Sequence, residues 1–153
     1  MSSFIQTFLM GIAGLIFLSW LFSRSSGWDE LSQKYKTEQC SPIVFIDNQQ
    51  GIFKNPDDNR GSTVIRPLNI GVSEEGMYLF LPFPYDVFYP SLLIPWDEIE
   101  YKTPHMQDDE NKRHTFYIGN PVITRLRLYP KAIEKLEEDY GEPIFSNKLG
   151  ELS

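Results

Sequence analysis

The spacing of hydrophobic and polar positions changes twice along the chain and divides it into three parts. The first part is an apolar run over residues 4–22, which contains no charged residue and is interrupted only by Gln6, Thr7 and Ser19. At a rise of ~1.5 Å per residue, a helix over this run is ~29 Å long, close to the ~30 Å hydrocarbon thickness of a bilayer. We therefore predict a transmembrane helix, with residues 1–24 as a membrane anchor.

A cleaved secretory signal is the main alternative to an uncleaved anchor, and a buried soluble helix is a third interpretation. A secretory signal carries Lys or Arg before its apolar run and a small-x-small cleavage site after it. Residues 1–3 have no charged side chain, and Ser23-Arg24-Ser25 places an arginine between the two small residues. These flanks favour the uncleaved anchor.

Some residues of the predicted anchor are suited to contacts with lipid headgroups or with another helix. Trp20 lies near the C-terminal end, where an indole can rest among headgroups, and Arg24 follows where it can reach phosphates. Gly11 and Gly14 would let a second helix approach closely, although their spacing differs from the four-residue repeat of the familiar dimer motif. The side chains expected to form the anchor are Phe4, Phe8, Leu9, Ile12, Leu15, Ile16, Phe17, Trp20, Leu21 and Phe22.

Positive charge near the ends of a span predicts its orientation, because flanks rich in Lys and Arg stay in the cytoplasm. The C-terminal flank contains Arg24, Lys34 and Lys36, and the N-terminal flank has no Lys or Arg. We therefore expect a single-pass protein with its N-terminus outside and its C-terminal domain in the cytoplasm.

The second part, residues 25–37, is predicted to contain a short juxtamembrane helix. Trp28, Leu31 and Tyr35 recur at helical spacing, and the polar positions between them are acidic in the first turn and basic in the last. Its polar face is not particularly basic, so we expect the apolar stripe to pack on the following domain rather than on lipid.

The third part, residues 38–153, is predicted to be one α+β domain. Apolar and polar residues alternate from residue 41 to residue 129 with turn residues at short intervals, a pattern typical of antiparallel strands. The clearest hairpin turns at residues 73–76. An amphipathic helix is expected between Pro130 and Gly141. Six or seven short strands followed by one helix predict a bent sheet or small barrel whose open end the helix covers.

The order of these elements resembles the pleckstrin-homology-like superfold. In addition, Gly76-Met77-Tyr78-Leu79 and Ile94-Pro95-Trp96-Asp97-Glu98-Ile99 look like a signature of small bacterial membrane-anchored proteins of uncharacterised function. The resemblance implies a pleckstrin-homology-like domain and a location at a bacterial inner membrane. It implies a fold more than an activity, because the residues that carry it are chiefly structural.

The members of that superfold that bind phosphoinositides have several Lys and Arg in and around the first hairpin. Here Lys54 and Arg60 lie beside Asp47, Asp57 and Asp58. We therefore expect no phosphoinositide ligand.

Composition narrows the class of partner further. The 153 residues include 14 Lys plus Arg and 21 Asp plus Glu, which gives a formal net charge of −7. Binding of nucleic acid through a broad basic face is not expected, because phosphate contacts need clustered cations. With Cys40 as its single cysteine, the chain cannot form an intrachain disulfide framework or a multi-cysteine zinc site.

Candidate groups for metal binding or catalysis are few. His105 and His114 flank the acidic residues 108–110, which suggests imidazole and carboxylate ligands, but their spacing matches no known metal motif. The surroundings of Cys40 match no nucleophile signature, and glycine-rich phosphate-binding loops are absent. We expect no cofactor, no metal and no enzymatic activity.

Arg125 and Arg127 are two residues apart on a predicted strand and therefore share one face. They could receive a carboxylate or a phosphate. Solvent-facing charges on a half-buried strand explain them equally well.

The least ordinary segment is residues 80–90, here called the aromatic loop, which has five aromatic residues, three prolines and a single charge. The prolines limit strand pairing, so aromatic side chains that cannot all be buried would form an apolar patch. The candidate partner-binding residues are Phe83, Tyr85, Phe88 and Tyr89. In the alternative interpretation, Phe83, Phe88 and Tyr89 fold back and cap the small core.

Three classes of function are compatible with these patterns. The favoured one is a membrane-anchored module that binds or scaffolds a protein partner. The second is an accessory or assembly subunit of a larger membrane complex, in which the span packs against other helices. An enzyme acting near the membrane is the third, and the sequence contains no motif that supports it.

Overall fold

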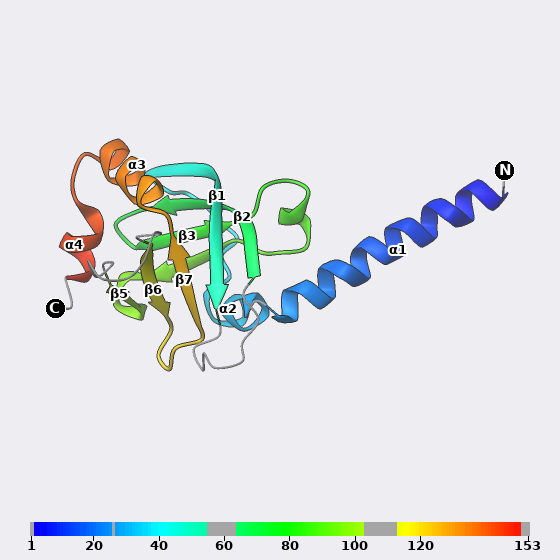
Figure 1. The fold of residues 1–153 in the computed structure, drawn as a ribbon, viewed down its shortest axis with the longest axis horizontal. Helices are drawn as coiled ribbons and strands as arrows, with labels where there is room; N and C mark the ends of the chain where they lie inside the picture. Colours follow the sequence, from blue (N-terminus) through cyan, green and yellow to red (C-terminus); the bar gives the residue numbers. More distant parts are fainter. Residues whose placement is uncertain (1, 26, 55–63, 103–112, 151–153) are drawn as a thin grey trace.

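The computed structural model describes residues 2–25, 27–54, 64–102 and 113–150, with the side chains of residues 2, 19–25 and 64–66 outside this description. The chain begins with a helix, α1 (Ser2–Ser25), that projects away from a rounded domain (Figure 1). The helix is uninterrupted because the run contains no proline and is rich in Leu, Phe and Ile. The domain that follows is α+β.

The apolar side chains of α1 are exposed along its described length, from 39% for Ile12 to 78% for Phe4. In the described parts of the chain, no helix is long and apolar enough to cross a membrane. The structure therefore confirms the predicted helix but does not show the predicted span. The predicted anchor residues Trp20, Leu21 and Phe22 lie outside the described side chains.

Helix α2 (Trp28–Tyr35) follows directly and packs on the domain. Gly27 precedes it with φ 71°, a left-handed conformation that favours glycine. Trp28 and Leu31 are fully buried and Tyr35 nearly so. The apolar stripe of α2 thus contacts protein, as its weakly basic polar face predicts.

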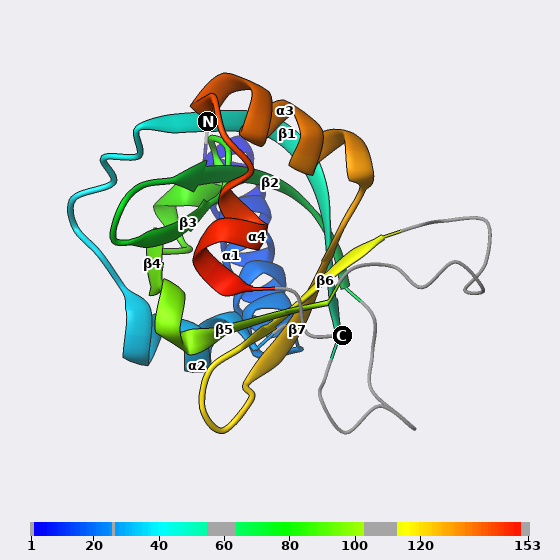
Figure 2. The same cartoon turned by 90° about the vertical axis from the view of Figure 1, so that its left-hand side faces the viewer.

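Seven antiparallel strands form one sheet in the order β4-β3-β2-β1-β7-β6-β5. The strands are β1 (Val44–Lys54), β2 (Val64–Val72), β3 (Gly76–Phe80), β4 (Leu92–Pro95), β5 (Ile99–Lys102), β6 (His114–Ile118) and β7 (Thr124–Leu128). The sheet curls into a nearly closed barrel, with β4 and β5 at its two edges (Figure 2). A short 3₁₀ turn, η2 (Trp96–Glu98), connects these edges.

The barrel closes because β1 is long and bent. Its N-terminal half pairs with β2, and its C-terminal half pairs with β2 on one side and β7 on the other. The register shifts between Ile46 and Gln49, where Asn48 has φ 51°. A bulge of this kind bends a strand and increases its twist, which turns one sheet into two facing halves.

Two C-terminal helices, α3 (Pro130–Tyr140) and α4 (Ile144–Leu149), cover the barrel on the side away from α1 (Figure 2). The predicted helix between Pro130 and Gly141 is confirmed, and Gly141 ends it with φ 91°. Helix α4 was not predicted. It buries Phe145 against the rings of Trp96, Tyr101 and Phe116.

The segment around Pro95 connects two turns of the barrel through the side chain of Trp96. Its indole Nε1 donates a hydrogen bond to the backbone oxygen of Ser73, at 3.0 Å. The residue therefore joins the turn between β4 and β5 to the hairpin turn between β2 and β3, which is a structural task.

Candidate functional site

The aromatic loop connects β3 to β4 and contains a short 3₁₀ turn, η1 (Tyr85–Val87). The backbone nitrogen of Tyr85 donates to the oxygen of Pro82 at 3.0 Å, and those of Phe88 and Tyr89 donate to the oxygen of Tyr85 at 3.1 and 3.2 Å. The loop is therefore a compact turn with internal hydrogen bonds, as prolines at strand ends predict.

The exposed side chains of this loop are mostly those that the sequence singled out. Phe83 is 81% exposed, Phe88 50% and Tyr85 49%. Val87, which the sequence analysis did not select, is 68% exposed. The sequence did contain a signal for Val87, because this residue lies in a loop that is bounded by prolines and has few polar residues.

Tyr89 has a different role from the other loop aromatics. It is buried and meets the ring of Trp28 edge to face, with centroids 6.2 Å apart. The indole Nε1 of Trp28 donates to the backbone oxygen of Pro90 at 3.2 Å. Tyr89 therefore folds back on the core while Phe83 and Phe88 stay outside, so each of the two alternatives for this loop describes part of it.

A second apolar surface lies at the start of β1. Ile43 is 61% exposed and Phe45 57%, and the ring of Phe45 contacts that of Phe80 with centroids 5.9 Å apart. Sequence reasoning missed these residues. The signal was present, because residues 42–46 are apolar at every position and one strand face of such a run must point away from the core.

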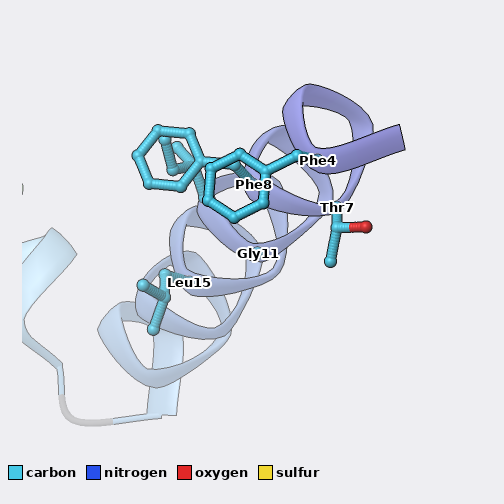
Figure 3. Close-up of a pocket in the computed structure, with 6 residues that line it drawn as sticks. Phe4, Thr7, Phe8, Gly11 and Leu15 are labelled. Carbon is cyan, nitrogen blue, oxygen red and sulfur yellow. The ribbon is translucent and has the colours of Figure 1, made fainter. Parts of the chain in front are cut away.

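Helix α1 carries a hollow on one side, shown in Figure 3. Gly11 leaves space there because it has no side chain, and a Cβ atom at that position would meet no atom within 4 Å in the described structure. The hollow is lined by Phe4, Thr7, Phe8, Gly11, Ile12 and Leu15. The spacing of three and four residues places them on one face. Gly14 also has open space around it but does not line the hollow.

The candidate metal ligands are not assembled in the part of the chain that the structure describes. Among those residues, no group of three or more His, Cys, Asp or Glu is placed to hold an ion. His105 and residues 108–110 lie outside the described residues. The thiol of Cys40 is on an exposed residue, and partial burial raises its pKa, which favours the unreactive thiol form.

Arg125 and Arg127 lie on the outer face of β7, as their spacing predicts, and both are half-buried. In the sheet, Arg125 is opposite Lys54 on β1, and Arg127 is opposite Thr115 on β6. Arg125 and Lys54 therefore place two positive charges opposite each other on neighbouring strands.

The two shortest ion pairs among the described residues join elements that are far apart in the sequence. Glu98 accepts hydrogen bonds from Lys34 at 2.9 Å and from Tyr35 at 2.8 Å, which joins α2 to η2. Those bonds lower the pKa of the Glu98 carboxyl. Glu74 accepts hydrogen bonds from Lys148 at 2.7 Å and from the hydroxyl of Tyr140. The hydrogen bond between Tyr140 and Glu74 raises the pKa of Tyr140 to about 12. The contacts of Glu98 join α2 to η2, and those of Glu74 join α3 and α4 to the turn between β2 and β3.

His114 lies on β6 beside Tyr101. The hydroxyl of Tyr101 is 2.5 Å from Nδ1 of His114, and the two rings are stacked. Burial lowers the pKa of His114 below its ordinary 6.5, and attraction to Glu134 partly offsets this. The folded protein therefore holds the proton less tightly than the unfolded chain does. The stability that neutral His114 contributes is complete above about pH 6.5 and decreases as the pH falls toward the lower folded pKa.

We accordingly expect the free energy of unfolding to fall less for His114→Gln than for the wild type when the pH is lowered from about 7.5 to about 5.5. Urea denaturation at the two pH values measures this difference. The carboxyls of Glu74 and Glu98 have a lowered pKa and therefore titrate below 4.5, outside the window. An equal loss in both proteins would show that another group titrates there.

These features define a class: a small α+β barrel that displays apolar surface on a compact loop, at the start of β1, and on a projecting helix. No protein-family model, curated protein or solved structure matches the chain.

Proposed function

We propose that the protein is a non-enzymatic binding module that α1 holds at a membrane, where the barrel binds a protein partner. The observation that carries this proposal is the exposure of the described apolar side chains of α1, which lie on every side of the helix. Successive residues of a helix are about 100° apart, so Leu15, Ile16, Phe17 and Leu18 point to all sides. Their exposed fractions are 66%, 46%, 57% and 49%.

A helix that is apolar on every side belongs inside a protein core or inside a bilayer. Burial of each such side chain is worth about 1.5–3 kcal/mol. Because α1 projects from the barrel (Figure 1), the barrel does not cover these side chains, and we propose that lipid does. We propose that the anchor extends through residues 19–22, which continue the uncharged run of the sequence. Arg24, Lys34 and Lys36 follow the apolar run, and we therefore propose that the barrel lies on the cytoplasmic side.

Charge supports a protein partner. Without Arg24, the remaining chain has 13 positive and 21 negative side chains, a net charge of −8. An acidic domain is repelled by an anionic leaflet over ~8 Å at physiological salt, so binding of lipid headgroups by the charged surface of the barrel is disfavoured. The exposed Ile43 and Phe45 offer a protein partner an apolar surface instead.

We also propose that the barrel is a pleckstrin-homology-like domain of a bacterial inner-membrane protein. Seven antiparallel strands and the helix that follows β7 support this assignment. The residues shared with the signature have structural roles in the fold. The Trp96 indole binds the hairpin turn, and Gly76 lets β3 and β4 come together.

Flotation with phosphatidylcholine vesicles tests the membrane part of the proposal. We expect the full-length chain to float with the vesicles. Ile12→Arg puts a charge near the middle of the apolar run and should weaken vesicle binding about 100-fold, since an arginine at the centre of a span costs about 2.5–3.5 kcal/mol. Ile12→Leu is the matched control and should float as the wild type does. Failure of the wild type to float would overturn the proposal.

The hollow around Gly11 favours the second candidate function, an accessory subunit of a membrane complex. Small residues allow the backbones of two membrane helices to approach closely, and Gly11 leaves such a space beside Phe8 and Leu15 (Figure 3). Replacing α1 with an unrelated apolar helix separates the two candidates. A simple anchor would retain its co-purifying partner after the exchange, and a subunit that packs through α1 would lose it.

A further inference from the structure

We propose that the aromatic loop enters the headgroup region of the same bilayer, so that the barrel contacts the membrane at a second point beside α1. The proposal rests on the membrane function proposed above and goes beyond it by assigning the loop to a lipid surface. It replaces protein docking as the role of the exposed loop aromatics Phe83, Tyr85 and Phe88.

The first argument is the distance between the loop and the anchor. Trp28 is only three residues beyond Ser25, the last residue of α1, and three residues span at most ~11 Å. The indole of Trp28 is hydrogen-bonded to Pro90 at the end of the loop. The base of the loop therefore lies close to the end of α1 whatever angle the helix takes. Figure 1 shows the loop on the side of the barrel from which α1 projects.

The second argument is the kind of side chain that the loop exposes. Among the large apolar side chains of the barrel that the structure describes, those of Phe83 and Val87 are the two most exposed, and Phe88 and Tyr85 lie beside them on the same turn. Aromatic residues are enriched at the headgroup level, because their rings are apolar and tolerate a wet edge. The one charged residue of the loop is Asp86.

The third argument is that the loop is held in place before it meets any ligand. Tyr89 is buried against Trp28, and backbone hydrogen bonds within the turn join residues 82–89. A loop fixed beside the anchor meets lipid in every membrane-bound molecule, since the anchor makes the contact intramolecular and its effective concentration high. A protein partner would have to reach the same narrow space between the barrel and the bilayer.

A fluorescent probe on the loop tests this inference in the full chain. Cys40→Ser removes the native thiol, and Val87→Cys then carries an environment-sensitive fluorophore at an exposed position. The matched control is Glu138→Cys, exposed on α3 at the opposite side of the barrel (Figure 1). Both proteins are bound to phosphatidylcholine vesicles with and without lipids that carry a nitroxide at the headgroup or the upper acyl chain.

We expect a blue shift and a loss of fluorescence to nitroxide lipid for the probe at residue 87, and neither for the probe at residue 138. Phe83→Ser combined with Phe88→Ser should reduce both signals at residue 87 while the chain still floats. Unquenched probes at both sites of a floating chain would overturn the inference and leave the anchor intact. If the fluorescence of the probe at residue 87 shifted to the blue only when a co-purified protein was present, the loop would bind a protein partner instead of lipid. A chain that does not float overturns the anchor and this inference together.

Discussion

Trp28→Ala should lower the free energy of unfolding by about 3–5 kcal/mol, the largest loss expected from a single truncation in this protein. The side chain is 1% exposed and packs edge to face on Phe53 of β1, with ring centroids 5.9 Å apart, and on Tyr89 of the aromatic loop. It also provides the hydrogen bond to Pro90. Removal of the indole would leave a cavity between α2, the barrel and the loop that none of them can fill alone.

Chemical denaturation followed by the fluorescence of the remaining tryptophans measures this loss. Trp28→Phe is the matched control. It keeps most of the apolar contact but has no donor for Pro90, so its loss should be clearly smaller. If Trp28→Ala were as stable as the wild type, α2 would not be an integral part of the domain. In that case the geometric link between the loop and the anchor would also fail.

Gly76→Ala should destabilise the barrel by about 3 kcal/mol or more, although it adds a single methyl group. An ideal Cβ at Gly76 lies 2.1 Å from the backbone oxygen of Ile94 and 2.8 Å from its carbonyl carbon. Both are main-chain atoms of β4, so no side-chain rotation can relieve the clash. The strands must separate, and this movement disturbs Met77 and Ile94, which are fully buried.

Gly11→Ala is the matched control for this substitution. A Cβ at Gly11 meets nothing within 4 Å of the described structure, so barrel stability should not change. Thermal unfolding followed by circular dichroism compares the two variants with the wild type. A Gly76→Ala protein with unchanged stability would show that β3 and β4 are held together less closely than their pairing indicates.

The elements that sequence patterns predicted well are those whose periodicity is local. The stripe of Trp28, Leu31 and Tyr35 predicted α2 and its buried face, and the alternation around residues 73–76 predicted the β2–β3 hairpin. Pro130 and Gly141 bounded α3 correctly. In each case the residues that decide the structure lie within one or two turns of one another, so a short window of sequence contains the necessary information.

Other features depend on contacts between distant segments and left little trace in the sequence. Helix α4 is only six residues long, and its burial follows from Phe145 reaching Trp96, Tyr101 and Phe116 on the barrel. The aromatic loop is similar. Its composition predicted exposed rings, but the composition does not distinguish Tyr89, which packs on Trp28, from Phe83, which points to solvent.

The sequence alone determined an uncharged apolar helix at the N-terminus, an α+β domain with mainly antiparallel strands, and an acidic surface charge. These properties follow from the identity and spacing of neighbouring residues. Only the tertiary structure decided how the barrel closes, which aromatics stay exposed, and that the loop ends beside the helix α2 that follows the anchor. The last contact joins Trp28 to Pro90 across 62 positions of sequence, and only the folded chain brings them together.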